Sequence, residues 1–465
     1  MKVRTSHSAS PIREMLSRRD IVALAILVGS GLCLILGPPL AVVAFLLLLA
    51  LAASIVSPCA ATSAVAASVP FVFHPISVRN AEFSLLEIML VMGCAGIAVR
   101  TVTVDQAQLL QIIRLDMIGH WCVTLLAGSL ILLGLISLVT LADAQHRPES
   151  LRELRVVIIE PIAALVLTRW TVRRHGMWPL VIGLVGAACA VAVVAVGQVL
   201  TGRGEVIGDG VGRATGPYPH PNNLALYLER IALCATAIAL LARRYRRLMV
   251  PIVVLLMLGL LATFSRGALL AAIAGIALLI WISRQRHAWR WFAAGIVILI
   301  AAFLTVAGNR FLASGSSGDV SSRELIWRSS LRMVADHLWF GVGLDQFLNQ
   351  YAPRYVSPAG WPERYTSHPH NLVLDVWLRL GIAGLAVLVG AIAMLMRAIR
   401  GLRRQTIDSE PWVLGVAASA MIVGGLAHGL VDNGFFLPDL AVLTWIGVGL
   451  IEFAVQPRPP TSAAS

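Results

Sequence analysis

Residues 367–396 read SHPHNLVLDVWLRLGIAGLAVLVGAIAMLM, the polar end of a long loop followed by an apolar run that begins at Asn371. The apolar run is long enough to cross the roughly 30 Å hydrocarbon core of a bilayer as a helix. Its charges, Asp375 and Arg379, stand four residues apart. We expect them to pair, because an isolated charge at that depth is costly. The stretch therefore predicts a membrane-spanning helix with a polar entrance.

Similar apolar runs fill the chain of 465 residues, which is 58% hydrophobic and only 13% charged. A soluble domain of ordinary composition is excluded, and the sequence predicts an all-α polytopic membrane helix bundle. We expect about 12 to 14 transmembrane helices, because the run at 59–77 contains Pro70 and His74 and is the weakest. No small-residue cleavage site follows the first apolar run, so we expect this helix to be retained. The predicted segments are 21–37, 39–56, 59–77, 83–100, 117–141, 155–169, 178–199, 222–242, 248–264, 267–283, 289–307, 371–396, 411–431 and 437–455.

The basic residues predict the orientation of the helices. The net charge of +13 comes from short clusters between apolar runs, which fits membrane topology and not nucleic-acid binding. Lys and Arg in short loops stay on the cytoplasmic side. This rule predicts cytoplasmic tails at 1–20 and 456–465, and outward connections at 142–154, 200–221 and 308–370. The clusters assigned to the cytoplasm are Arg173 and Arg174, Arg243, Arg244, Arg246 and Arg247, Arg284, Arg286 and Arg290, and Arg397, Arg400, Arg403 and Arg404.

The connection at 308–370 divides the helices at 21–307 from those at 371–455 and is far longer than packed helices require. Loops of this length are usually functional or disordered. This one is rich in Trp, Phe and Tyr, and residues 322–337 have an amphipathic helical pattern. We therefore expect a large, partly helical extracytoplasmic loop.

Outward arginines oppose the bias that orients the chain and therefore indicate a specific role. A guanidinium binds phosphate oxygens in a bidentate manner, so clustered arginines at helix ends favour an anionic ligand. Any single one has a simpler explanation as a solvated charge or a lipid-headgroup contact. The set comprises Arg203, Arg213, Arg266, Arg310, Arg323, Arg328, Arg332, Arg354 and Arg364.

Three outward segments carry the candidate site residues. The stretch 204–223 reads GEVIGDGVGRATGPYPHPNN and brings Arg213, His220 and Asn222 to the entrance of a helix, where capping is the alternative role. In SHPHN at 367–371, His370 lies at a predicted membrane boundary. A neutral His there can accept a proton from an attacking hydroxyl while nearby arginines stabilise a departing anion. Asp432, in HGLVDNGFFLPD at 428–439, can orient that His, bind sugar hydroxyls or cap a turn.

Motifs of other enzyme classes are missing from the sequence. There is no Walker loop, no HExxH and no outward DxD pair to hold a metal-bound sugar nucleotide. These absences favour chemistry without a metal or a cofactor.

The pattern resembles the O-antigen ligase and O-antigen polymerase superfamily of bacterial envelope glycosyltransferases. The most specific similarity is His370-Asn371 followed by Gly381 and Gly384. Weaker collinear similarities are RATGPYPHPN at 213–222, SRGA at 265–268, Arg323 to Trp327 leading to Gly341-Val342-Gly343, and His428 to Asp432, so the resemblance covers roughly residues 155–450. This chain departs from the family pattern at two positions. Leu338 replaces the usual Pro before the Gly-Val-Gly turn. Arg379 stands where an acidic residue is usual, and this second change bears on acceptor choice or on the charge of the site.

This resemblance implies a GT-C-like membrane fold in the bacterial cytoplasmic membrane. It also implies inverting, metal-independent transfer of a glycan from undecaprenyl diphosphate to a hydroxyl of a glycan, lipid A core or protein on the periplasmic face. His370 would be the general base and Asp432 its support. Arg213, Arg323 and Arg266 would bind the donor diphosphate. The residues Asn371, His220 and Asn222 would support the site.

A transporter or lipid-linked glycan flippase without transferase activity is the alternative function. Such proteins place polar residues along a path through the bilayer midplane. Here Glu160 and Glu229 lie deep in apolar segments, whereas most polar residues gather at the outer rim. The acceptor is not decided by the sequence.

Overall fold

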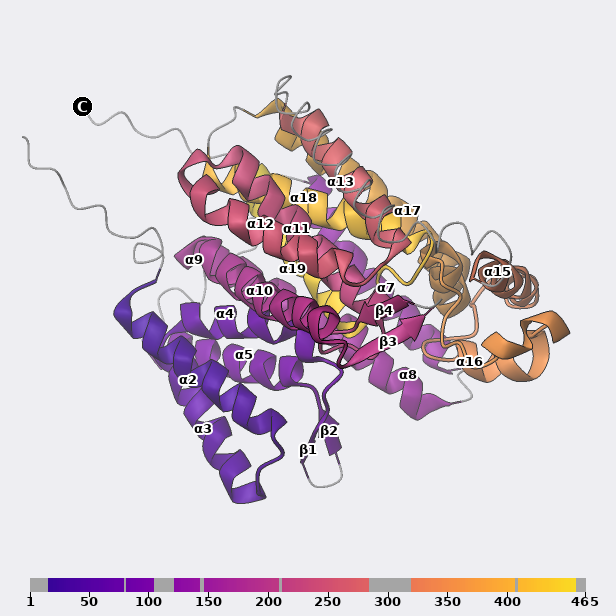
Figure 1. Ribbon diagram of the computed structural model, residues 1–465, viewed down its shortest axis with the longest axis horizontal. Coiled ribbons are helices and arrows are strands. Elements are labelled where there is room, and N and C mark those ends of the chain that lie inside the picture. Colours follow the sequence, from indigo (N-terminus) through magenta and orange to yellow (C-terminus); the bar gives the residue numbers. More distant parts are fainter. Residues whose placement is uncertain are drawn as a thin grey trace, which may run out of the picture. The chain divides into compact units, whose positions relative to one another are not determined.

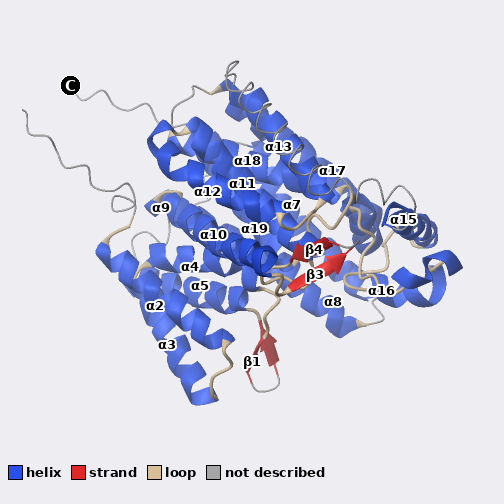
Figure 2. Cartoon of the chain, in the orientation of Figure 1, coloured by secondary structure: helices blue, strands red, loops and turns tan. Residues whose placement is uncertain are grey.

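The computed structural model describes residues 16–78, 81–103, 121–142, 146–208, 211–283, 319–405 and 409–456, and the chain forms two compact units (Figure 1). In these ranges helices dominate and the strands form two short antiparallel hairpins (Figure 2). Among the described residues, seven helices are long and apolar enough to span a membrane. The predicted all-α polytopic membrane class is therefore confirmed. The predicted span at 289–307 lies outside the described residues.

The first unit comprises residues 1–115 and 167–187. Its helices pack closely through small residues, since a Cβ on Gly96 of α5 would lie 2.5 Å from the Ser54 side chain of α3. The predicted helix at 59–77 is too long, because α4 ends at Ser68 and Pro70 cannot donate a helical hydrogen bond. The elements are α2 (Arg18–Ile35), α3 (Leu40–Val56), α4 (Pro58–Ser68), η1 (Val69–Phe71), β1 (Ile76–Val78), β2 (Ala81–Phe83) and α5 (Leu85–Thr103).

The second unit, residues 116–166 and 188–465, contains the predicted site segments. Its central helix is α11 (Pro221–Leu241), nearly all of whose residues are buried, with α12, α13 and α18 packed around it (Figure 1). Helices α9 (Glu160–His175) and α10 (Trp178–Thr201) cross the boundary between the units. The remaining helices of this unit are α7 (Trp121–Ala142), α8 (Arg147–Leu154), η2 (Arg155–Ile159), η3 (Arg243–Tyr245), α12 (Arg246–Leu261), α13 (Arg266–Ser283), α15 (Asp319–Asp336), α16 (Phe347–Gln350), η5 (Tyr351–Tyr355), η6 (Pro358–Glu363), α17 (Leu372–Arg404), α18 (Glu410–Gly429) and α19 (Pro438–Val455).

The long loop is folded wherever it is described. The predicted amphipathic helix at 322–337 is α15. Its inner face joins a small core of Ile326, Met333, Phe347 and Tyr351 with Leu378 of α17. The loop is thus attached to the helix that follows it.

Helix α17 is interrupted at Gly381, whose φ of 65° and ψ of −164° are not helical. A Cβ there would lie 1.9 Å from the carbonyl oxygen of Trp339. The turn at Gly341-Val342-Gly343 packs into this interruption, and the Val342 amide donates to the Leu378 carbonyl at 2.5 Å. The two glycine motifs of the sequence therefore form one contact, which fixes the loop against the start of α17.

Arg379 lies in a buried ion pair beside the interruption. Its Nε donates to Asp375 Oδ1 at 2.7 Å, which confirms the predicted pair. Its guanidinium also bonds Glu153 of α8 and stacks 4.7 Å from the Phe436 ring centroid. Two carboxylates therefore compensate the buried charge of Arg379.

Replacing Gly381 with Ala is expected to destabilise the protein by at least about 2 kcal/mol, because the added Cβ meets backbone in a left-handed conformation. The matched control is Gly390→Ala in the same helix, where a Cβ meets nothing within 4 Å. The control should be neutral or slightly stabilising. Thermal unfolding of the two purified variants in detergent measures the difference. Equal melting temperatures would contradict this account of the glycine.

Candidate functional site

Asp432 lies at the centre of the candidate site, in the turn between α18 and α19. The His428 carbonyl, at the end of α18, accepts hydrogen bonds from the amides of Val431 and Asp432 at 2.9 and 3.1 Å. This turn carries Asp432 back into the protein, where its side chain is only 4% exposed. A carboxylate buried to that degree requires donors around it.

Four groups surround the Asp432 carboxylate. His370 Nδ1 lies 3.0 Å from Oδ1, and the Asn433 amide donates to the same oxygen at 2.8 Å. Asn222 Nδ2 donates to Oδ2 at 3.1 Å. Arg323 Nη2 of α15 lies 3.7 Å from Oδ2. The carboxylate thus joins the long loop to the start of α11.

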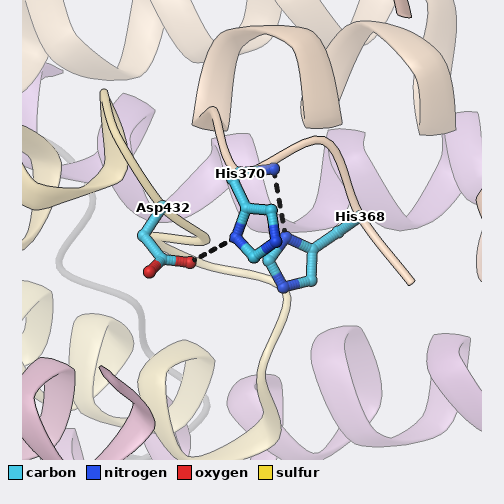
Figure 3. Close-up of side chains that lie close together, drawn as sticks. All are labelled: His368, His370 and Asp432. Carbon is cyan, nitrogen blue, oxygen red and sulfur yellow. Dashed lines mark hydrogen bonds and ion pairs between the residues drawn. The ribbon is translucent and has the colours of Figure 1, made fainter. Parts of the chain in front are cut away.

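His370 is held at the entrance of α17 in a left-handed conformation with a φ of 52°, which costs energy for a residue with a Cβ. Asn371 follows as the N-cap of α17. Its Oδ1 accepts from the amides of Val373 and Leu374 at 3.0 and 3.1 Å. Figure 3 shows the His370 ring directed at Asp432, with His368 below it. The Nε2 atom of His370 lies 3.3 Å from the Thr366 hydroxyl.

The two ionisable neighbours of His370 have displaced pKa values. Burial alone would raise the pKa of Asp432, but the hydrogen bond from His370 and the positive charge of His370 in its protonated form hold it far below its usual range. Burial, aided by the charge of His370, lowers the pKa of His368 to about 3. Asp432 is therefore ionised and His368 neutral at physiological pH.

Arg213 reaches the same centre through Asn222. Its Nη2 donates to Asn222 Oδ1 at 2.6 Å, and its Nε donates to the Thr263 carbonyl at 2.9 Å. Asn222 therefore connects Arg213 to Asp432. His220 is the N-cap of α11, and its Nδ1 accepts from the Asn222 amide at 3.1 Å. The predicted loop at 200–221 contains a hairpin, β3 (Glu205–Gly208) and β4 (Val211–Ala214), with Arg213 on β4.

Arg266 is the first residue of α13 and is half-buried. The next residue, Gly267, packs on the ring of His428: a Cβ there would lie 2.1 Å from His428 Nε2. The motif containing Arg266 thus contacts the helix end from which the turn to Asp432 begins.

Sequence reasoning missed the buried partners behind this turn. His428 Nδ1 lies 2.6 Å from Glu229 Oε2 of α11. Arg230 is also buried and donates to the Leu440 carbonyl at 3.1 Å. Glu229 was noticed only as a deep charge. The signal that could have identified the pair is the rule that an intramembrane charge has a partner.

Three of these residues could hold a metal ion. The ligand atoms of His368, His370 and Asp432 all lie within 4.8 Å of one another. Both Asp432 oxygens, however, already accept hydrogen bonds, and the positive charge of Arg323 lies 3.7 Å away. A nearby positive charge opposes the binding of a divalent cation. The arrangement fits a His–Asp dyad better than a metal centre.

A cavity of about 410 Å³ opens beside His370 and Asp432. Its volume lies in the range of roughly 300–1,000 Å³ that is typical of small-ligand sites. A substrate hydroxyl can therefore reach the dyad.

Comparisons with known proteins match part of the chain. Residues 251–389 match the family model described as O-antigen ligase. This range includes Arg266, Arg323 and His370. The chain is also 31% identical over 212 residues to an O-antigen ligase of Pseudomonas aeruginosa. That match covers 43% of this chain and 46% of the relative, so the chain spans less than half the length of this curated relative. The comparisons confirm the resemblance found in the sequence: residues 251–389 match the family model, and part of the chain is similar to a curated O-antigen ligase.

Proposed function

We propose that the protein transfers a glycan from undecaprenyl diphosphate to an acceptor hydroxyl at the periplasmic face of the bacterial cytoplasmic membrane. The observation that carries this proposal is the His370–Asp432 dyad, with Arg323 Nη2 3.7 Å from the same carboxylate. This arrangement places a base, His370, near a cation, Arg323, where the long loop meets the membrane helix α17. The family match supports a lipid-linked glycan as the donor.

The dyad suits His370 to act as the general base. When Asp432 accepts a hydrogen bond from Nδ1–H, Nε2 is the unprotonated ring nitrogen, and the Thr366 hydroxyl 3.3 Å from it is the group that an acceptor hydroxyl would displace. Nε2 takes the proton of the acceptor hydroxyl while its oxygen attacks the anomeric carbon. The bond between that carbon and the diphosphate oxygen breaks, and attack from the opposite face inverts the configuration. The proton is then released from Nε2 to solvent.

The arginines can stabilise the diphosphate leaving group. When the glycosidic bond breaks, negative charge develops on the diphosphate, and fixed guanidinium groups stabilise it without metal. We assign this role to Arg213 and Arg323, with Arg266 at the end of α13 as a further contact. Asn222, His220 and Asn371 hold the helix ends in place.

An apolar pocket of about 100 Å³ lies next to the site and suits the start of the isoprenoid chain of a lipid-linked donor. Its wall includes Val376 and Leu395 of α17, Leu426 of α18 and Trp445 of α19, and it reaches Leu372, two residues from His370. None of Arg213, Arg266 and Arg323 lines this pocket, so the diphosphate of a chain bound in it would lie outside the pocket, beyond Leu372. The arginine clusters in the short loops support cytoplasmic termini. With the termini on that side, the site lies on the outward face.

The buried charges of Glu229 and Arg230 fit a transferase better than a transporter. Glu229 bonds His428, and Arg230 bonds main-chain carbonyls of the last helix and of the turn before it. These groups tie helices together and do not line a polar path through the membrane.

The purified protein is expected to transfer glycan from an undecaprenyl-diphosphate-linked donor to glycan, lipid A core or peptide acceptors in the presence of EDTA. His370→Ala should lower transfer by at least about 10²-fold, because the base is lost, while membrane insertion is unchanged. His337→Ala is the matched control, a half-buried histidine of the same loop. Mass spectrometry of the product measures transfer. Wild-type transfer by His370→Ala would defeat the mechanism, and loss on chelation that added metal restores would defeat metal independence.

Arg323→Ala should lower kcat by about 10²-fold or more, the usual effect of removing one group that stabilises developing charge. Arg328→Ala is the matched control, because Arg328 lies on the same helix but is exposed and pairs with Glu324. Its kcat should stay within about twofold of wild type, as expected for an exposed pair. Steady-state kinetics with varied donor measure both variants. Equal losses in the two variants would show that the effect is not specific to the site.

A further inference from the structure

The cavity beside His370 has a second wall that the proposed mechanism does not use. Its first wall carries His370, Asp432 and Asn222, and the second carries Glu363, Tyr365 and Thr366 from the end of the long loop. Arg213 and Arg323 do not line it. Among the described residues, the cavity therefore contains the base and lacks the two arginines assigned to the diphosphate, as expected of an acceptor side.

Tyr365 is presented to this cavity as an open aromatic surface. Its side chain is 71% exposed. The Arg364 guanidinium lies 4.4 Å from the Tyr365 ring centroid and 4.9 Å from that of Trp361. Arg364 Nη1 also donates to the Trp361 carbonyl at 2.9 Å. Tyr365 is thus exposed yet held in orientation by its neighbour.

The segment that carries Tyr365 is anchored to the folded part of the loop. Helix η6 is capped by Ser357, whose hydroxyl accepts a hydrogen bond from the Gly360 amide at 3.2 Å. Gly360 is buried, and a Cβ on it would lie 3.6 Å from Leu325 of α15 and 3.9 Å from the Tyr351 hydroxyl. A rigid support of this kind suits a recognition surface.

The chemistry of this cavity matches a pyranose ring. The axial C–H bonds of a sugar form an apolar face, which an aromatic ring with its negative π-face attracts. Hydroxyls at the rim of the sugar need paired donors and acceptors, which the carboxylate of Glu363 and the amides of Asn222 and Asn223 supply. A serine or threonine hydroxyl on an extended peptide has no such apolar face.

We propose that Tyr365 stacks on a pyranose ring of the acceptor, so that the acceptor of this protein is a sugar hydroxyl and not a protein hydroxyl. This inference rests on the proposed function. It assigns the cavity to the acceptor and makes Tyr365 a determinant of acceptor class. The stacked ring would present its hydroxyl to His370.

The test varies the acceptor concentration at saturating donor, with the full-length protein in detergent. Tyr365→Ala should raise the acceptor KM by about tenfold or more, with kcat and donor KM little changed, while Tyr365→Phe keeps the ring and stays near wild type. Trp339→Ala is the matched control, an aromatic residue of the same loop that is 64% exposed and does not line this cavity. Peptides containing Ser and Thr should accept no glycan.

An acceptor KM that is unchanged in Tyr365→Ala, or raised equally in Trp339→Ala, would overturn the stacking role. Transfer to peptides in preference to sugars would overturn the acceptor class. A second readout separates these failures from failure of the proposed function. Saturation-transfer NMR with a mixture of short neutral hexopyranose oligosaccharides should show sugar contact in wild type and loss in Tyr365→Ala, even if no donor is consumed. Absence of contact in wild type would count against the subsite itself.

Discussion

The buried carboxylate of Asp432 is the constraint on which the candidate site depends. An ionised carboxylate with 4% exposure would be costly without compensation, and here three hydrogen-bond donors and the nearby cation of Arg323 supply it. His370 ends the long loop, Asn222 begins α11 and Arg323 belongs to α15. The groups that stabilise the Asp432 carboxylate therefore include both a base, His370, and a cation, Arg323. The same burial that makes the carboxylate expensive strengthens its effect on His370.

Contacts at the end of α18 and at the start of α17 fix the position of the Asp432 carboxylate. The turn to Asp432 starts at His428, whose ring lies between Glu229 and the Cα of Gly267. On the other side, Gly341 and Gly381 allow the long loop to contact α17 next to the entrance of His370. Glycines allow these close approaches because a Cβ would meet backbone or ring atoms. Strain remains at His370 itself, with a φ of 52°, as is common where function sets the conformation.

The apolar runs of the sequence predict much of the fold, but they predict less of the candidate site. The apolar runs predicted the spanning helices, and the spacing of Asp375 and Arg379 predicted their pairing, because both are local features. The support of His370 by Asp432 was expected from the family resemblance, whereas the link of Asp432 to Asn222, 210 positions away, was not predicted because no local pattern indicates it. The hairpin at 205–214 was expected as a loop, and the Glu229–His428 pair was missed. Both depend on contacts between distant segments. The roles assigned to Arg213, Arg266 and Arg323 remain predictions.

The central claim is that Asp432 holds the His370 ring with Nδ1 protonated and Nε2 free to act as base. The protonated nitrogen can be observed directly by ¹⁵N NMR of histidine-labelled protein, with the His370 signals assigned by their loss in His370→Gln. The account predicts the Nδ1–H tautomer in wild type and a shift toward Nε2–H in Asp432→Asn. A wild-type His370 that carries its proton on Nε2, or one unaffected by Asp432→Asn, would contradict it.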